Sequence, residues 1–294
     1  METLPALLTL SAVMCYTGQN FFNKCYTNAY QGPGETIGSL FSLVYGLVVG
    51  VITLGLGGFR FAPDGATWLL GSCNGVALVL FNRAMIGAGR RGPFTFQSMI
   101  AAFSGIIVPM AGLYLLYGDA IAPIRLVGIA LMLAAMVGYN AQGLSFSGVK
   151  KGYGAYLVLL FIANGAYGLL NAVQQRVESN ALHTEMILVT FWVSAVLSGG
   201  LLLCEKKSPL RQVFRAGKRA WAFALLSSVC AAFAVNLLMR ALRYVPAALL
   251  YAINNGGILI LLALLNRAVL GERIGKLQWV AIAAAVAALV LMNL

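Results

Sequence analysis

Long apolar runs, separated by short polar turns, follow one another along almost the whole chain. Each run has about 20 residues, enough for a helix to cross a bilayer core of roughly 30 Å. Backbone polar groups in lipid must be satisfied within the segment, so each run is predicted to be helical. The pattern predicts ten spans, at residues 4–23, 37–57, 68–88, 94–116, 122–143, 154–175, 185–204, 220–241, 246–268 and 275–293.

The second half of the chain repeats the first at a nearly constant spacing. At a distance of 153 positions, Trp68, Pro93, Gly118 and Asp119 recur as Trp221, Pro246, Gly271 and Glu272. At a distance of 150, Gly18, Glu35, Phe41 and Gly50 recur as Gly168, Glu185, Phe191 and Gly200. We therefore predict a duplication, with one repeat at residues 1–150 and the other at residues 151–294.

Ten spans divided between two repeats give five spans to each. An odd number of spans makes the second repeat enter the membrane from the opposite side, so the repeats are predicted to be inverted. Inverted repeats surround a shared site near the midplane and permit alternating access. The predicted fold class is an all-α integral membrane protein, with ten transmembrane helices built as two inverted five-helix repeats and no soluble domain.

Composition supports a membrane protein, with 61% hydrophobic and only 10% charged residues. The formal charge of +12 comes from basic residues scattered over loops, so we expect no nucleic-acid partner. The five cysteines lack CxxC or metal-ligand spacing and are interpreted as small hydrophobic residues. No metal and no cofactor is predicted.

The basic residues are unevenly divided between the two predicted faces. One face carries fourteen Lys and Arg residues, with the 205–219 loop the richest, and the other carries five. The positive-inside rule puts the 205–219 loop in the cytoplasm and both termini outside. We expect an integral protein of the bacterial plasma (inner) membrane, with the lipid bilayer and a small-molecule substrate as partners. A monomer suffices, since both repeats are in one chain.

The turns before the ninth and tenth spans read ALRYVPAA and GERIGKLQW, and diverged copies in the first half read RRGPFTFQ and YGDAIAPIRLVG. With these motifs the chain resembles an EamA-type carrier of the drug/metabolite transporter superfamily over essentially its full length. The resemblance implies a transporter and not an enzyme, with a central cavity lined by spans 1, 3, 4, 6, 8 and 9. Such carriers more often have both termini inside, which conflicts with the charge count.

Polar side chains form a stripe on the first span and another on the sixth. Tyr16 and Asn20 lie one turn apart, with Asn23 continuing the stripe, and Asn164, Tyr167 and Asn171 continue to Gln174 in the same way. Matched stripes on helices related by the repeat are typical of a midplane substrate site. The alternative is hydrogen bonding between packed helices.

Spans four and nine add Gln97, Tyr251 and Asn254 to the predicted substrate-binding residues. The Asn254-Asn255-Gly256-Gly257 run is costly in lipid, so it is interpreted as a place where the helix meets ligand or water. The alternative is tight packing against the tenth span.

Arg83 is the only charged residue predicted well inside a span. It follows Asn82, which lies opposite Asn236 in the repeat. Arg83 either extends to the membrane surface or faces the cavity and binds a carboxylate or phosphate. In the second case Asn82, Arg83 and Asn236 join the substrate-binding residues, and Arg83→Ala is expected to abolish transport.

No carboxylate is predicted at the bilayer centre, which argues against a proton-coupled exporter of cationic drugs. His183 is interpreted as a solvated loop residue. The leading hypothesis is a secondary-active or facilitative transporter that moves a small polar metabolite, zwitterionic or anionic, by alternating access. An exporter or facilitator of neutral or hydrophobic solutes, including drugs, is the alternative. A membrane-embedded enzyme is a third alternative, for which the chain offers no catalytic cluster.

Overall fold

The computed structural model describes residues 3–32, 36–89, 91–92, 94–118, 121–140, 149–177, 182–204, 216–270 and 275–293. These residues form ten helices: α1 (Thr3–Ala29), α2 (Ile37–Leu56), α3 (Gly65–Gly89), α4 (Phe94–Tyr117), α5 (Pro123–Asn140), α6 (Tyr153–Val177), α7 (His183–Cys204), α9 (Lys218–Ala241), α10 (Ala247–Leu270) and α11 (Lys276–Asn293). Each predicted span corresponds to one of them. The prediction of an all-α fold with ten helices is confirmed.

Most of the helices have the length and composition of membrane spans. Within the described part of the chain, α2, α3, α4, α6, α7, α9 and α10 are long and apolar enough to cross a bilayer. Helices α5 and α11 are apolar but shorter. Large apolar side chains such as Val51, Leu115 and Val196 lie on the outer surface, at 64%, 80% and 74% exposure. A lipid environment suits such a surface, whereas water does not.

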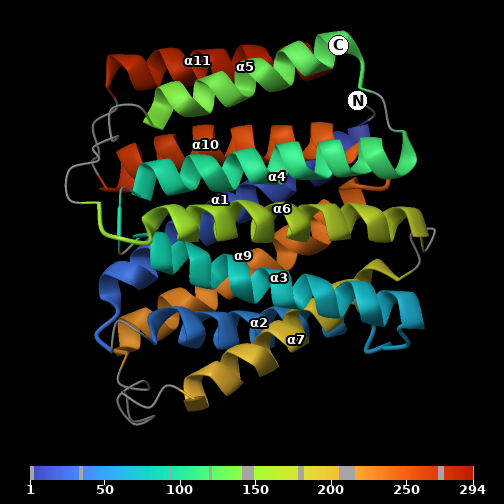
Figure 1. The fold of residues 1–294 in the computed structure, drawn as a ribbon, viewed down its shortest axis with the longest axis vertical. Coiled ribbons are helices and arrows are strands. Elements are labelled where there is room, and N and C mark those ends of the chain that lie inside the picture. Colours follow the sequence, from blue (N-terminus) through green and yellow to red (C-terminus); the bar gives the residue numbers. More distant parts are fainter. Residues whose placement is uncertain are drawn as a thin grey trace.

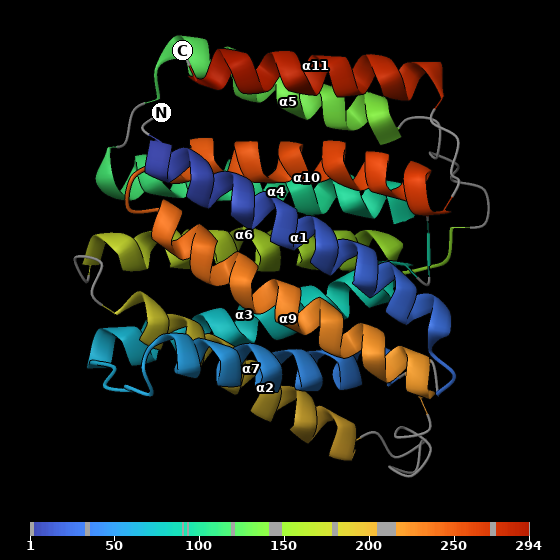
Figure 2. The same ribbon diagram turned by 180° about the vertical axis from the view of Figure 1, so that it is seen from behind.

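The helices lie roughly parallel and are stacked in levels along the long axis of the molecule (Figures 1 and 2). From one end to the other, the levels hold α5 with α11, α4 with α10, α1 with α6, α3 with α9, and α2 with α7. Every level therefore contains one helix from residues 1–150 and one from residues 151–294.

The paired helices run in opposite directions, as the chain colours show for α1 in Figure 2 and α6 in Figure 1. The packing is symmetrical as well. The contact of α1 with α9 is matched by that of α6 with α3, and the contact of α4 with α6 by that of α10 with α1. When each helix is exchanged for its counterpart in the other half, the contacting pairs α2–α7 and α5–α11 are unchanged. The two-repeat division stays a prediction, and this arrangement supports it.

Glycines allow α7 to approach α2 and α3 very closely. A Cβ atom at Gly46 of α2 would lie 2.5 Å from the carbonyl oxygen of Phe191, and one at Gly75 of α3 would lie 2.7 Å from that of Thr190. Backbone atoms cannot move aside as a flexible side chain can. Small residues at such contacts are the usual way in which membrane helices pack tightly.

Two hydrophobic cores fill the molecule. The first joins α4, α5, α10 and α11 to parts of α1, α6 and α9, with Met132, Met136 and Leu250 fully buried. The second joins α2, α3, α7 and α9 to the end of α1, with Leu40, Ile187 and Phe191 buried. The boundary between the two cores lies at the level of α1 and α6.

Candidate functional site

Four tyrosines from four helices meet at the boundary between the two cores. Tyr16 of α1 lies close to Tyr45 of α2, Tyr167 of α6 and Tyr251 of α10. Tyr16 and Tyr251 belong to the first core, and Tyr45 and Tyr167 to the second. We call these four residues the tyrosine cluster. It lies near mid-membrane, because Tyr16, Tyr45 and Tyr167 are each within a turn of the middle of their helices.

Tyr251 lies near the N-terminal start of α10, but its side chain reaches the same depth as the other three tyrosines. Its hydroxyl donates a hydrogen bond of 2.9 Å to the carbonyl oxygen of Gly168, in the middle of α6. Gly168 also packs closely on Pro109 of α4, where an added Cβ would lie 2.9 Å from Pro109 Cγ. The absence of a side chain at position 168 therefore leaves room for α4 and for the Tyr251 ring together.

The polar stripe of α1 points away from lipid. Leu7, Leu10 and Met14 are 61%, 56% and 61% exposed and mark the outer face of the helix. Tyr16 and Asn20 lie on the opposite face, as their spacing from these residues requires. Asn20 is nevertheless exposed. Asn20 is thus an exposed polar residue on the side of α1 opposite to its lipid-facing residues.

The polar stripe of α6 has the same arrangement. Val158 and Ile162 are 61% and 59% exposed on its outer face, and Tyr167 and Asn171 lie on the other side of the helix. Helix α1 packs mainly on α9 and α10, whereas α6 packs mainly on α3 and α4. The two stripes thus face each other across the centre of the bundle.

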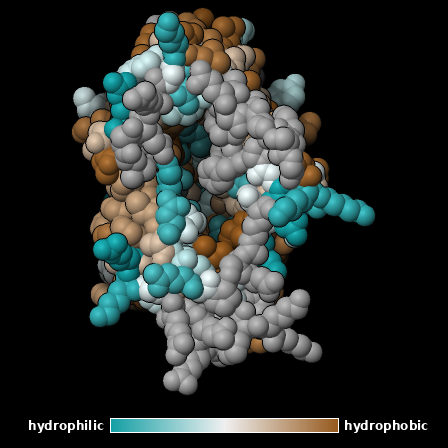
Figure 3. Space-filling model, turned by 90° about the vertical axis from the view of Figure 1, so that its left-hand side faces the viewer, coloured by the Kyte–Doolittle hydropathy of each residue, from teal (hydrophilic) through white to brown (hydrophobic). Residues whose placement is uncertain are grey.

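The molecule is hollowed on the face where α1 ends and α6 begins (Figure 3). Hydrophilic residues occupy part of the rim of this hollow. This is the face to which the sequence assigns fourteen of the basic residues. On the opposite face, Arg243 approaches His183, with 2.7 Å between Nη2 and Nδ1, and Arg176 lies 5.7 Å from the centre of the Tyr117 ring. His183, predicted to be a solvated loop residue, is instead the first residue of α7.

A buried amide pair adjoins the tyrosine cluster. Asn74 of α3 donates a hydrogen bond of 2.8 Å from Nδ2 to Oδ1 of Asn171 and lies 3.4 Å from Thr190 Oγ1 of α7. Asn171 in turn contacts the Tyr167 hydroxyl. Asn74 is 0% exposed and was not among the predicted site residues. A single Asn in the middle of an apolar span is costly, which is the signal that could have identified it.

Three buried amide oxygens around the cluster lack a hydrogen-bond donor: Gln19 Oε1, Asn74 Oδ1 and Asn254 Oδ1. Gln19 donates from Nε2 to the Tyr45 hydroxyl at 3.0 Å, which leaves Oε1 unused. Asn254, at 6% exposure, lies one turn after Tyr251. An unsatisfied buried polar atom costs about 1 to 3 kcal/mol. Water or a solute that donates hydrogen bonds would remove this cost.

Several predicted site residues make hydrogen bonds between helices. Asn82 donates to Ser42 Oγ at 2.8 Å, and Asn236 donates to Thr53 Oγ1 at 2.8 Å, so both attach to α2. Asn164 donates to the Ala101 carbonyl oxygen at 2.7 Å and to Ser104 Oγ at 2.9 Å, both on α4. The structure does not bring Asn82 or Asn236 to the tyrosine cluster. For these residues the alternative of interhelical hydrogen bonding is favoured.

Gln97 and the paired glycines of α10 also have packing partners. Gln97 is 1% exposed and donates to the carbonyl oxygen of Met85 at 2.8 Å, near the start of α4 and away from the cluster. Helix α10 continues without a break through Gly256 and Gly257. Gly256 contacts Met132 of α5, and a Cβ at Gly257 would lie 2.8 Å from Val13 of α1. The glycines favour packing, although against α5 and α1 and not against the last helix.

Arg83 lies on the outer face of α3. It continues a stripe of exposed residues at helical spacing: Leu69, Cys73, Val76 and Leu80. The Arg83 side chain is itself exposed. This position suits a guanidinium that extends along the lipid-facing surface to the nearby membrane boundary. It gives no support to the prediction that Arg83 binds an acidic group in the cavity.

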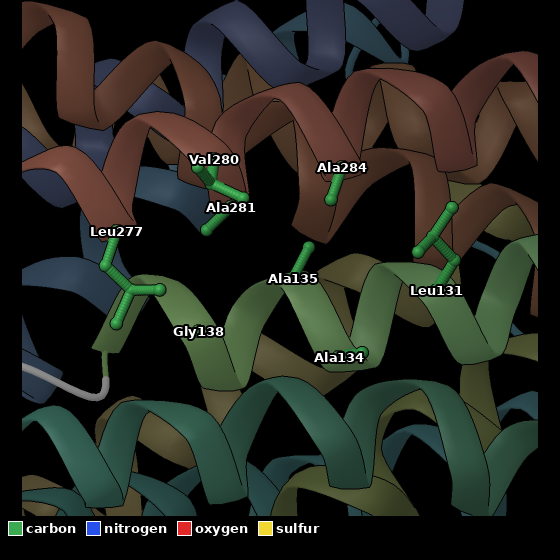
Figure 4. A pocket seen from close by; sticks show the side chains of 8 residues that line it. All are labelled: Leu131, Ala134, Ala135, Gly138, Leu277, Val280, Ala281 and Ala284. Atoms are coloured by element: carbon green, nitrogen blue, oxygen red, sulfur yellow. The ribbon is translucent and has the colours of Figure 1, made fainter.

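A pocket lies away from the site, between α5 and α11 (Figure 4). Only apolar residues line it: Leu131, Ala134, Ala135, Gly138, Leu277, Val280, Ala281 and Ala284. Nothing there binds a polar solute. Among the described residues, no group of three or more His, Cys, Asp or Glu side chains is placed to hold a metal ion.

Comparison with known proteins identifies the class of the molecule. Residues 154–294 match the EamA-like transporter family. The crystal structure of another protein is similar in fold, with a TM-score of 0.74 and 15% sequence identity. The similarity covers 100% of this chain and 99% of the other chain. At this identity the similarity concerns the fold alone. No curated protein matches the chain.

The match covers the second of the two predicted repeats, and the similar fold covers both. The chain is thus a membrane protein with a small-molecule substrate, and not an enzyme. The protein is therefore a membrane transporter whose second half, residues 154–294, forms a domain of the EamA-like transporter family.

Proposed function

We propose that the protein is a secondary-active or facilitative carrier of a small polar metabolite, which binds at the tyrosine cluster and crosses the membrane by alternating access. One observation carries the proposal: polar stripes on α1 and α6 face each other at mid-membrane between two separate hydrophobic cores. Packing alone would favour apolar contact at this depth, because buried polar groups in lipid are costly.

The core of the proposed site is smaller than the set predicted from the sequence. Its members are Tyr16, Asn20, Tyr167, Asn171, Tyr251 and Asn254, joined by Gln19, Tyr45 and Asn74. Asn82, Asn164 and Asn236 support it by holding helices together. The hollow in Figure 3 is a route by which a solute reaches the site from the face rich in basic residues.

A thermal-shift screen of the detergent-purified protein against metabolites tests the proposal. A ligand that binds the folded form at 100 times its Kd adds about 2.7 kcal/mol to stability. We expect Asn171→Ala to remove this stabilisation and Asn236→Ala to retain it. The two residues form a matched pair, at 5% and 4% exposure, but only Asn171 adjoins the cluster. Equal ligand responses in both variants would contradict the proposed site.

A facilitator of neutral solutes is the second candidate. The observation that favours it is the lining itself, which consists of phenols and amides at the level of the cluster. Saturable transport by the purified protein without any ion gradient would favour this candidate. A requirement for a proton or sodium gradient would favour coupled exchange.

We further propose that the hollowed face lies in the cytoplasm. The support is the count of basic residues, fourteen on that face against five on the other. Both termini lie on the opposite face (Figure 1). A reporter fused after Leu294 that is active only outside the cell would agree with this orientation, and a reporter active only in the cytoplasm would reverse it.

A further inference from the structure

We infer that the site selects solutes that carry no net charge, neutral or zwitterionic, and that donate at least one hydrogen bond from N–H or O–H. The inference rests on the proposed function, since it names the substrate class of the same site. It depends on two observations, the position of the charged residues in the helices and the unsatisfied amide oxygens around the tyrosine cluster.

Charged side chains are absent from the middle of every described helix. Those within the helices lie no more than two turns from a helix end: Lys24, Arg83, Arg125, Arg176, Glu185, Lys218, Arg219, Arg240, Arg267 and Lys276. A solute with a net charge at the tyrosine cluster would therefore lose its water without gaining a counter-charge. Such burial is strongly unfavourable. A solute without net charge avoids this penalty.

Lys24 is on the same helix as Tyr16 and Asn20, one turn beyond Asn20 toward the hollowed face. A flexible lysine there can meet a solute as it enters. It cannot neutralise a solute seated among Tyr16, Tyr167 and Tyr251, because it lies about 12 Å along α1 from Tyr16 at 1.5 Å per residue.

The amide oxygens indicate which polar groups the solute needs. Gln19 Oε1, Asn74 Oδ1 and Asn254 Oδ1 come from three different helices, and each adjoins a residue of the cluster or its partner. All three accept hydrogen bonds and none can donate. A solute with N–H or O–H groups satisfies them. The opposite end of a zwitterion has the hydroxyls of Tyr16 and Tyr167 as donors.

Exchange from proteoliposomes tests the inference by class of solute, so that no single substrate has to be chosen. The vesicles are loaded with a defined mixture that contains equal numbers of solutes with zero, negative and positive net charge: neutral amino acids, nucleosides and sugars; organic acids and sugar phosphates; polyamines and basic amino acids. Mass spectrometry measures the loss of each solute relative to protein-free vesicles. We expect at least tenfold faster loss only in the group without net charge.

The possible failures are distinguishable. Fastest loss in the anionic or cationic group would overturn the inference and leave the carrier function intact. No loss above that of protein-free vesicles in any group would contradict the carrier function itself.

A charge placed in the site provides an independent readout. Gln19→Glu replaces the amide that donates to the Tyr45 hydroxyl by a carboxylate that accepts from it, and so places a negative charge beside the cluster. We expect the ratio of cationic to neutral solute loss to rise at least tenfold. Asn28→Asp is the matched control, since Asn28 is exposed at the end of α1, and its selectivity should remain that of the parent protein. An unchanged ratio in a folded Gln19→Glu protein would refute the assignment of Gln19 to the site.

Discussion

Asn74 and Asn171 are joined by a hydrogen bond of 2.8 Å that links α3 to α6, and with them the first half of the chain to the second. Both side chains are buried, at 0% and 5% exposure. Because Asn171 also contacts Tyr167, the bond sets the position of an amide at the edge of the tyrosine cluster.

Replacement of Asn74 by Ala should weaken solute binding more than it weakens the fold. Interhelical hydrogen bonds in membranes contribute about 0.6 to 1.7 kcal/mol, so the variant should remain folded. In the exchange assay we expect the solute concentration for half-maximal transport to rise about tenfold. The maximal rate should change less. Thr190→Val removes only the 3.4 Å contact and should behave like the parent protein. Equal effects of both substitutions would contradict a positioning role for Asn74.

Asn164 should prove to be a packing residue. Its two bonds to α4 are lost in Asn164→Ala, which should lower the stability by about 0.6 to 2 kcal/mol. The rise in melting temperature caused by a bound ligand should remain. Both quantities come from one thermal melt with and without ligand. A stable variant that no longer responds to ligand would instead make Asn164 a binding residue.

Arg83→Gln should leave transport within about twofold of the parent protein, because the side chain lies on the outer stripe of α3 and not at the cluster. Rates in proteoliposomes check this expectation. A loss of transport in a protein that folds normally would restore the binding role that the sequence suggested for Arg83.

Gly46→Ala should destabilise the protein, because the new Cβ would lie 2.5 Å from the Phe191 carbonyl oxygen and 2.8 Å from Ala195 Cβ. Overpacking of this kind costs about 1 to 3 kcal/mol. Gly55→Ala, on the same helix, is the control, since nothing lies within 4 Å of its Cβ. A thermal melt that ranks the two variants equally would show that α2 and α7 can separate at little cost.

The sequence predicted the helices well because span length and hydropathy are local properties. It also predicted the inward faces of α1 and α6, where the spacing of Tyr16, Asn20, Tyr167 and Asn171 decides which side chains share a face. It could not separate binding amides from packing amides. Asn236 and Asn171 are alike in type and burial, and differ only in whether Thr53 or Tyr167 stands opposite.

Two residues show different reasons for failure. Asn74 belongs to no polar stripe, so its sequence signal is only its isolated position in an apolar span, and its hydrogen bond to Asn171 shows which residue it positions. The distance of Arg83 from the end of the span is compatible with both a binding role and extension to the membrane surface. The direction of the side chain around the helix axis decides between the cavity and lipid. Its helical spacing from Leu69, Val76 and Leu80, which are exposed, indicates that Arg83 lies on the same outer face.

The interleaving of the two halves restricts how this carrier can change shape. Each level of the stack takes one helix from each half, and α7 is wedged against α2 and α3 by glycines that leave no clearance. Because the helices of the two halves alternate in the stack, the halves cannot move as two separate rigid bodies. With the proposed alternating access, a hinge would pass through both halves, along the boundary that α1 and α6 form between the two hydrophobic cores.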